Sequence, residues 1–480
     1  MNAQIIKLFA FITVCFAVLV GFTSYWSVFD AENLKNEQVN KRPLFQAQQI
    51  KRGTIFSSDG DVIAESKSTG SGASKQFVRE YPFGTLFGHP VGYSFLTEGN
   101  SEFEAFHNQE LIGEGSEFTS IVDEIRGKKQ VGHDITTGLD TSAQQTAVDM
   151  LGGQPGAVVA MVPQTGQIKA LVSQPSFDPN LVPEQLTELQ SDPSAPLYAA
   201  ATQGQYPPGS TFKLVTATAA IDSGAIDADT LIDSPASLNI QGQELANADF
   251  NPYGEIDVET ALTNSVNTYF AKLGQRIGED TLYEYMDRFG FNAKPQIDIP
   301  PRQLSVSGVF GDNTILTPDE GVDIARIAIG QERLLATPLQ MAEVASTIAN
   351  GGKLMKPQIW SEVTDVDGRT LDTMDGDEQS DVMSEDTADQ LTEAMKSVVE
   401  EGTGTAAALS GIDVAGKTGT AEVPGREDCN GLPNQAWFVG FAPADDPQIA
   451  VAATVECTTG QGGTVAAPIA AAVMQDLLGG

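Results

Sequence analysis

Pro207-Pro208-Gly209-Ser210-Thr211-Phe212-Lys213 opens a run of helix formers near the middle of this 480-residue chain. Residues three apart share a helix face, so the stretch predicts a serine at the start of a helix with a lysine beside it. A serine hydroxyl is a poor nucleophile until a base removes its proton, and the Lys213 amine is placed to do so. The alternative is that Ser210 is an ordinary helix N-cap behind the Pro-Pro-Gly turn.

The histidines narrow the choice of base. His89, His107 and His133 are the three histidines of the chain, and all precede the predicted larger domain. A Ser-His-Asp triad inside that domain is therefore excluded. Lys213 is the local alternative, but it must be neutral part of the time. Burial and a nearby cation both lower the pKa of a lysine, and Lys417 is a candidate for that cation.

A second element, Ser265-Val266-Asn267, follows a helical pattern and is expected at a helix end or in a loop. A second hydroxyl there can relay a proton to a leaving amine. An asparagine can clamp a substrate amide with one donor and one acceptor group. By itself the pair fits a capping or turn role equally well.

A third element, Lys417-Thr418-Gly419-Thr420, lies in the first strand of a predicted late sheet. Lysine and threonine side chains there can hold a substrate carboxylate by charge-assisted hydrogen bonds. Gly419 permits close approach of a ligand backbone, so a peptide can lie beside this strand as an added strand. The backbone amides of Ser210 and Thr420 are candidates for an oxyanion hole. The alternative is a glycine-interrupted edge strand with a surface lysine.

Together these elements form the ordered S-x-x-K, S-x-N and K-T-G set of penicillin-recognising acyl transferases. The chain resembles class B penicillin-binding proteins, the membrane-anchored peptidoglycan D,D-transpeptidases, and the short N-terminal part is most similar to the actinobacterial penicillin-binding protein A type. The resemblance covers the chain from about residue 40 to the end, and its motifs are Arg52-Gly53-Thr54-Ile55, Asp59-Gly60, Ser176-Phe177-Asp178-Pro179-Asn180, Tyr206 to Lys213 and Ala415 to Glu422.

The resemblance implies a role for each motif residue. Ser210 is expected to be the acylated nucleophile and Lys213 its base, while Ser265 shuttles protons with electrostatic support from Lys417. Substrate binding is expected from Asn267, which would orient the stem-peptide backbone, and from the strand residues Thr418, Gly419 and Thr420. The two threonines would bind the terminal carboxylate.

The implied reaction begins with attack on the D-Ala-D-Ala bond of a peptidoglycan stem peptide and releases D-Ala. The acyl group then passes to an amine on a neighbouring stem peptide, and β-lactams acylate the same serine. No cofactor or metal is implied. Family members often work with a polytopic glycan polymerase, and the region before residue 135 is too short for a glycosyltransferase domain.

Competing functions share parts of this pattern. Two β-lactamase classes are not matched, because no Glu-x-x-Leu-Asn follows Ser265 and because Asn267 stands where one class has valine. A D,D-carboxypeptidase differs only in using water as the acceptor and stays open. A non-catalytic β-lactam receptor is disfavoured by the tiny predicted cytoplasmic tail, and a scaffold with a dead site by the intact motif set.

Composition bounds the remaining classes. Apolar residues make up 41% of the chain, so two or three domains with large cores are expected. The formal net charge of −37 argues against nucleic-acid binding. The three cysteines form no Cys-x-x-Cys or Cys/His cluster, so no metal site is predicted. In an exported domain Cys429 and Cys457 either form a disulfide or remain free thiols.

An uncharged run from Leu8 to Val28 is long enough to cross a bilayer as a helix. Tyr25 and Trp26 fall where an interfacial aromatic belt lies, and Lys7 favours a cytoplasmic N-terminus. A cleaved signal peptide is the alternative, but no clear small-x-small cleavage site follows. We expect a single-pass cell-membrane protein with its catalytic domain outside.

The predicted fold class is α+β, a penicillin-binding transpeptidase fold in which helices flank an antiparallel sheet. Residues 1–29 are the cytoplasmic tail and anchor, 30–135 a non-catalytic pedestal domain and 136–480 the transpeptidase domain. The sheet is expected from a hairpin over 156–172 and from strands over 415–423, 435–442 and 448–456.

Further expectations concern helices and loops. Thr317 and Thr337 are each expected to cap a helix that begins with proline, the second through a capping box. Helices are predicted over 387–401 and 468–478, a mobile loop over 67–75 and a solvated acidic loop over 365–389.

Overall fold

A five-stranded antiparallel sheet forms the centre of the C-terminal part of the chain. The computed structural model describes residues 2–24, 50–70, 75–113, 130–312, 314–422, 429 and 431–479. The strand order is β20-β21-β22-β7-β8, with β7 over Gly156–Met161, β8 over Ile168–Gln174, β20 over Ala415–Glu422, β21 over Asn434–Ala442 and β22 over Ile449–Thr458. Pairing of β22 with β7 brings the early hairpin beside the late strands. The predicted antiparallel sheet is confirmed.

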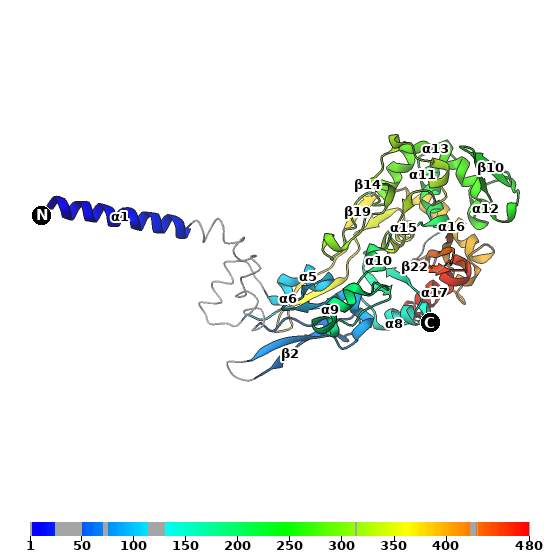
Figure 1. Ribbon diagram of the computed structural model, residues 1–480. Helices are drawn as coiled ribbons and strands as arrows, with labels where there is room; N and C mark the ends of the chain where they lie inside the picture. Colours follow the sequence, from blue (N-terminus) through cyan, green and yellow to red (C-terminus); the bar gives the residue numbers. More distant parts are fainter. Residues whose placement is uncertain are drawn as a thin grey trace.

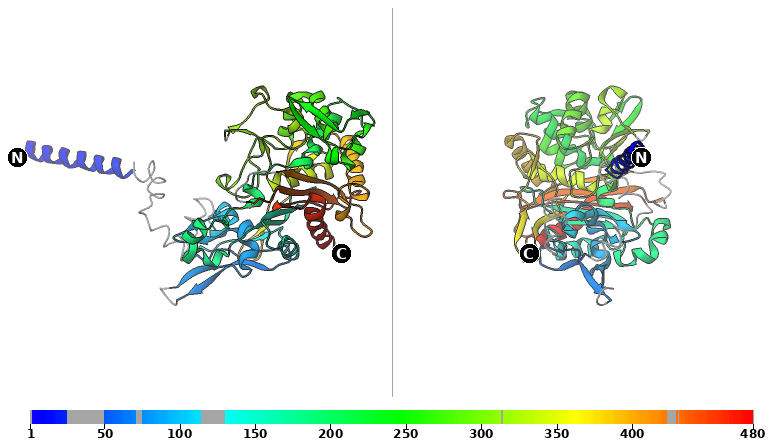
Figure 2. Two further views of the ribbon diagram at one scale, coloured as in Figure 1. Left: turned by 45° about the vertical axis from the view of Figure 1, so that its right-hand side comes forward. Right: turned by 90° about the vertical axis from the view of Figure 1, so that its left-hand side faces the viewer.

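The sheet is covered on both faces. Helices α8 (Thr141–Leu151) and α17 (Gly462–Leu477) share one hydrophobic cluster with Val158 and Ala160 of β7. Helix α15 (Pro338–Ala349) shares the other cluster with Val159 and Met161. Successive side chains of a strand point to opposite faces, so burial on both faces accounts for the unbroken apolar run of β7. Figure 2 shows the orange and red strands between these two layers.

Two helix boundaries differ from the predicted ones. Helix α16 spans Glu385–Glu400 and is capped by Ser384. Helix α17 begins at Gly462, so Pro468, the predicted first residue, lies inside the helix. A Cβ on Gly462 would lie 2.2 Å from the Trp437 carbonyl oxygen and 2.3 Å from that of Gly419. The helix therefore begins at a close tertiary contact that local sequence does not reveal.

The two threonine caps also behave differently from expectation. Thr317 forms a capping box with Glu320, but the turn Pro318–Glu320 ends at Gly321 and helix α14 (Ile324–Ile327) starts afresh. Thr337 caps α15 by accepting from the Gln340 N–H. The Gln340 side chain donates instead to the Phe289 carbonyl over 2.7 Å, so the predicted capping box at Thr337 is wrong.

A helical layer covers the α15 face of the sheet. It includes α11 (Lys213–Asp222), α12 (Val258–Thr263) and α13 (Asn267–Arg288), which Figure 1 shows together at the top of the molecule. The other short elements between residues 182 and 335 are α9 (Val182–Ser191), α10 (Ala200–Gln203), β9 (Ile232–Ser234), β10 (Ser237–Ile240), β11 (Gln243–Ala246), β12 (Gly254–Ile256), β13 (Gly308–Gly311), β14 (Thr314–Ile315) and β15 (Leu334–Leu335).

A second sheet of six strands has the order β18-β17-β6-β1-β2-β3. Its N-terminal strands are β1 (Ile55–Phe56), β2 (Val62–Thr69), β3 (Gln76–Glu80) and β6 (Asp134–Thr137). The hairpin predicted at Asp59-Gly60 is confirmed by the β1–β2 pairing. The predicted loop over 67–75 is wrong for Lys67 to Thr69, which continue β2 and pair with β3. Residues 71–74 lie outside the described part of the chain.

The predicted acidic loop over 365–389 is also wrong. Strands β17 (Trp360–Thr364) and β18 (Thr370–Thr373) form a hairpin that extends the N-terminal sheet, and β19 (Glu378–Asp381) pairs with β16 (Lys353–Met355). All four side chains of β18 are exposed, so no apolar alternation marks it as a strand. A segment of the C-terminal half therefore completes the sheet of the N-terminal part.

Buried charges join these N-terminal strands to the short helices α5 (Glu102–Phe106) and α6 (Asn108–Ile112). Glu104 accepts from Arg52 Nε and from Arg79 Nε, each over 2.6 Å. Nearby, His107 Nε2 lies 3.2 Å from Asp298 Oδ2. Burial lowers the pKa of His107, but hydrogen bonds to Asp298 and Glu110 outweigh it and raise this pKa to about 9.

Helix α1 spans Asn2–Ser24, and Gln4–Thr23 within it is a candidate membrane span of mean hydropathy 2.6. None of the side chains in this span is buried in the protein. The predicted run thus lies in a helix from Leu8 to Ser24, while Tyr25 to Val28 lie outside the described residues.

Candidate active site

Ser210 lies in a 3-10 turn, η5 (Gly209–Phe212), that leads into α11. The N-cap of this turn is Pro208, so the alternative in which Ser210 is the N-cap is wrong. The Gly209 N–H donates to the Gly330 carbonyl over 2.9 Å. A Cβ on Gly330 would lie 1.8 Å from the Gly209 oxygen. The turn is therefore held by a backbone contact that tolerates only glycine at position 330.

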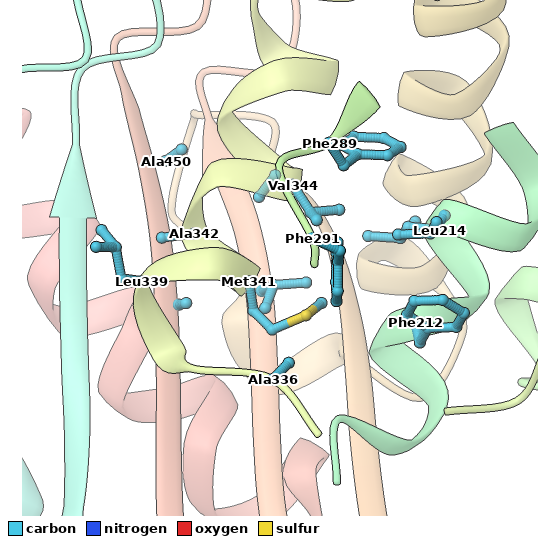
Figure 3. Close-up of a cluster of buried hydrophobic side chains, with 14 of the residues drawn as sticks. Phe212, Leu214, Phe289, Phe291, Ala336, Leu339, Met341, Ala342, Val344 and Ala450 are labelled. Carbon is cyan, nitrogen blue, oxygen red and sulfur yellow. The ribbon is translucent and has the colours of Figure 1, made fainter. Parts of the chain in front are cut away.

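The side chain of Phe212 fixes this turn by packing into the hydrophobic core. Its fully buried ring meets that of Phe291 edge to face with 5.7 Å between centroids. Figure 3 shows Phe212 and Leu214 facing Phe291 and Met341 in one apolar cluster. The half-buried Ser210 precedes this anchor by two residues, so a well-packed core fixes the backbone that carries it.

The Lys213 amine is fully buried and is oriented by the second element. Its Nζ lies 2.7 Å from the Ser265 carbonyl, 2.7 Å from Asn267 Oδ1 and 3.1 Å from Ser265 Oγ. Among the described hydrogen bonds none joins Lys213 to the Ser210 hydroxyl. A neutral amine has two N–H groups and one lone pair. The two carbonyl-type acceptors can take the two N–H groups, which leaves the lone pair for a hydroxyl proton.

Ser265 lies between α12 and α13 with φ of 55°. A non-glycine residue with a positive φ costs of order 1–3 kcal/mol and persists only where its surroundings fix that conformation. Here the Lys213 amine binds both its carbonyl and its hydroxyl. Asn267 is the first residue of α13, and its Nδ2 donates to the Ala246 carbonyl over 2.9 Å. The predicted placement at a helix end is confirmed.

Strand β20 is an edge strand of the sheet, so the first part of the alternative for the third element is correct. The second part is wrong, because Lys417 is not a surface lysine. Its side chain is fully buried, and Nζ donates to the Thr418 carbonyl over 3.1 Å. In register, Lys417 pairs with Val439 and Thr418 with Phe438. Val439 belongs to the cluster of the helical layer and Phe438 to that of α17. The strand therefore points Lys417 and Thr418 to opposite faces.

The turn that carries Ser210 lies directly against β20. A Cβ on Gly419 would lie 2.8 Å from the Pro208 carbonyl oxygen and 3.2 Å from the Thr211 nitrogen. The Trp437 indole of the next strand donates to the Pro207 carbonyl over 3.0 Å. The structure thus brings together the three elements that lie far apart in the sequence.

Both buried amines have lowered pKa values. Burial is the larger cause for Lys213, and the charge of Lys417 adds to it, so the pKa of Lys213 lies well below its usual range. Burial lowers the pKa of Lys417 to about 7. Among the described residues neither amine forms an ion pair with a carboxylate.

The two strand threonines face the start of α17. The Thr418 hydroxyl lies 2.6 Å from that of Thr403, and the Thr420 hydroxyl oxygen accepts the Gly462 N–H over 3.0 Å. Beyond these, Cys429 and Cys457 are joined in a disulfide with 4.8 Å between their Cα atoms. The disulfide ties the segment after β20 to the end of β22.

Sequence reasoning missed three contacts of the site. These are made by Trp437, Gly330 and Thr403, none of which belongs to a motif. A signal existed for Trp437, because a buried indole N–H normally requires an acceptor. For Gly330 and Thr403 the local sequence carried no comparable sign.

Comparison with known protein families adds independent evidence. The family described as "Penicillin binding protein transpeptidase domain" matches residues 156–475. The family described as "Penicillin binding protein A dimerisation domain" matches residues 52–135.

Individual proteins with similar sequences and structures agree with these matches. "Peptidoglycan D,D-transpeptidase PbpA" of Mycobacterium tuberculosis is 32% identical over 504 aligned positions that cover 100% of both chains. A solved structure of penicillin-binding protein A from M. tuberculosis, a ceftriaxone acyl-enzyme complex, matches with a TM-score of 0.80 and 31% identity over 90% of this chain and 99% of that one. A D,D-transpeptidase domain structure from Eggerthella lenta matches with a TM-score of 0.76 and 33% identity over 90% of this chain and 98% of that one.

Proposed function

Because the chain belongs to the penicillin-binding protein transpeptidase family, we propose that it is a peptidoglycan D,D-transpeptidase with Ser210 as its nucleophile. The observation that carries the assignment of residues is the position of Lys213. It lies one turn after Ser210, is bound to both polar residues of the second element, and has no carboxylate partner among the described residues. This environment suits a lysine that acts as a base.

The first half of the reaction forms an acyl-enzyme. Lys213 takes the proton of the Ser210 hydroxyl while Oγ attacks the carbonyl carbon of the D-Ala-D-Ala bond. The backbone N–H groups of Ser210 and Thr420 stabilise the developing oxyanion. As the C–N bond breaks, Ser265 passes a proton from Lys213 to the leaving amine of D-Ala. The 3.1 Å contact between Lys213 Nζ and Ser265 Oγ supports this relay.

In the second half an amine of a neighbouring stem peptide attacks the ester carbonyl. Its proton returns through the same groups to Ser210 Oγ as the C–O bond breaks, and a new amide links the two peptides. Asn267 orients the donor backbone, Gly419 lets it approach β20, and Thr418 with Thr420 hold its terminal carboxylate. The cation of Lys417 lowers the pKa of Lys213 and supports Ser265.

The remaining assignments concern the whole protein. We assign residues 1–29 to the tail and anchor, 30–135 to the pedestal and 136–480 to the transpeptidase domain. The N-terminus lies in the cytoplasm and the catalytic domain outside, where its partners are the membrane and a polytopic glycan polymerase. Support comes from the apolar helix α1 and from Lys7 as the one charged residue before the uncharged run.

Intact-mass detection of a covalent penicillin adduct on the full chain tests the assignment of Ser210. We expect one adduct that maps to the peptide containing Ser210, and no adduct in Ser210→Ala. Thr211→Ser, a change of the adjacent buried hydroxyl, is the matched control and should still be labelled. An adduct that maps elsewhere, or labelling of Ser210→Ala at the wild-type rate, would reject the nucleophile.

Products from a stem-peptide substrate then identify the acceptor. With an amine acceptor present, the cross-linked peptide should exceed the hydrolysed one. Hydrolysis alone, with or without amine, would instead identify a D,D-carboxypeptidase.

A further inference from the structure

Thr403 touches the proposed carboxylate site, although none of the three motifs contains it. It follows α16 in the loop Glu401-Gly402-Thr403-Gly404, and its hydroxyl lies 2.6 Å from that of Thr418. Thr418 is only 6% exposed, whereas Thr403 is among the exposed residues. Thr403 is thus the more exposed residue of the pair.

The loop that carries Thr403 is held on two sides. The Thr403 N–H donates to the Thr263 carbonyl at the end of α12 over 3.3 Å. A Cβ on Gly402 would lie 2.5 Å from that same oxygen, and one on Gly463 of α17 would lie 2.3 Å from the Thr403 carbonyl oxygen. The position of Thr403 is therefore set by the helix that precedes Ser265 and by the helix that faces Thr420.

Either hydroxyl can donate in this contact, and hydrogen-bond counting shows which direction would serve a bound carboxylate. A hydroxyl has one proton to donate, and a carboxylate can only accept. If Thr418 donated to Thr403, its proton would be lost to a substrate carboxylate. If Thr403 donates to Thr418, the Thr418 proton stays free for the substrate. Thr420 already follows the second pattern, because its oxygen accepts the Gly462 N–H.

We propose that Thr403 is a positioning residue of the carboxylate site. Its hydroxyl donates to Thr418 Oγ1 and so directs the Thr418 proton toward the terminal carboxylate of a stem peptide or β-lactam. The start of α17, with its partial positive charge, lies beside the same threonines and favours an anion there. This inference rests on the proposed function, because it assumes that Thr418 and Thr420 bind that carboxylate.

The test compares the wild type with Thr403→Val, which keeps the shape and removes the hydroxyl, and with Thr403→Ser, which keeps the hydroxyl. Thr405→Val, a change at another exposed threonine two residues later, at the start of the 3-10 turn Thr405–Ala407, is the matched control. For each protein we would measure the second-order rate constant of acylation by penicillin G and by penicillin G methyl ester, which lacks the carboxylate charge. Thermal melts of all variants check the fold, and Thr403→Ala replaces the valine variant if that one does not fold.

We expect Thr403→Val to lower the rate constant with penicillin G about 3- to 10-fold, the size expected for the loss of one hydrogen bond between neutral groups. The loss should lie in the binding constant more than in the limiting acylation rate. With the methyl ester the same variant should change the rate constant less than about 2-fold. Thr403→Ser and Thr405→Val should stay close to the wild type, and adding Thr403→Val to Thr418→Val should cause no further loss.

Other outcomes would overturn the inference. A wild-type rate of Thr403→Val with penicillin G would show that the contact does not serve the carboxylate. Equal losses with the acid and the ester would indicate a general structural role. In both cases the wild type is still acylated at Ser210 and the proposed function stands. A wild type without any adduct at Ser210 would instead overturn the proposed function and this inference together.

Discussion

Two groups of buried charges in this molecule follow opposite designs. Beside the N-terminal sheet, Glu104 of α5 has an arginine on each carboxylate oxygen, and its side chain is fully buried. In the active site, Lys213 and Lys417 are buried side chains with no carboxylate partner among the described residues. The first group pairs a carboxylate with two guanidinium groups, and the second has no opposite charge beside its amines among the described residues.

The difference appears in the pKa values. Burial raises the pKa of Glu104, but Arg52 and Arg79 outweigh it, so this pKa is lowered overall and the carboxylate stays charged. Burial lowers the pKa of both lysines, and no neighbouring group among the described residues raises it. Paired burial thus keeps a charge and fixes a structure, whereas unpaired burial produces an amine that can exchange a proton near neutral pH.

The largest effect is expected from Lys213→Arg in the active site. The guanidinium keeps the positive charge but does not lose its proton in proteins, so it cannot act as the base. Acylation by penicillin should fall about 10²- to 10⁴-fold, the usual contribution of general base catalysis. Lys272→Arg, at a more exposed lysine on α13, is the control and should leave the rate unchanged. A rate of Lys213→Arg within about threefold of the wild type would contradict the assigned role of Lys213.

Glu104→Gln should break the paired group without touching the chemistry. Two buried arginines would then lack a counter-charge, which destabilises proteins by about 3–5 kcal/mol. Because the pKa of Glu104 is lowered from 4.5, its contribution is complete above pH 4.5 and is lost as the pH falls below that value. Chemical denaturation measures the loss, and the acylation rate of the folded protein should stay at the wild-type value. A variant as stable as the wild type would contradict this account.

Lys417→Met should stabilise the protein, whereas Glu104→Gln should destabilise it. The pKa of Lys417 is about 7 in the folded protein and 10.5 as an ordinary lysine, so between these values the unfolded chain binds more protons. Wild-type stability should therefore rise with pH across that window. The methionine variant lacks this contribution, so its melting temperature should exceed that of the wild type most clearly below pH 7.

Two measurements check this reversal. The difference in melting temperature between Lys417→Met and the wild type should shrink from pH 7 toward pH 10, while acylation by penicillin is slower in the variant at pH 7. A difference that does not change with pH would show that the Lys417 charge is not the cause.

The smallest effect is expected from an ion pair at the surface. Lys67 and Glu80 link β2 to β3, but their side chains are 52% and 43% exposed. Water screens such a pair, and holding two long side chains together offsets much of the attraction. Glu80→Gln should leave both the melting temperature and the acylation rate at their wild-type values. A marked drop in the melting temperature would contradict the expectation that an exposed ion pair contributes much less to stability than the buried pairs of Glu104.

Much of this could be predicted from the sequence, and the reasons are physical. The strands β7, β8, β21 and β22 are largely apolar runs bounded by turn residues, which are strong local signals. The N-cap of α8 is a local feature of the same kind, because the Asp140 side chain accepts the N–H of Ala143 three residues later. In contrast β18 was missed, because its four side chains are exposed and its partner β17 lies in a sheet begun by N-terminal strands. The start of α17 was missed because it depends on a contact with β20.

The candidate site divides in the same way. The order and spacing of Ser210, Lys213 and the two later motifs predicted a serine acyl transferase. The three motifs together are typical of the penicillin-recognising enzymes, although each motif alone is a weak signal. Only the tertiary structure decided that Lys417 is buried and that Lys213 is bound by Ser265 and Asn267. It alone placed Thr403 beside Thr418. Burial and contact between distant segments depend on how the chain packs, and a pKa depends on both.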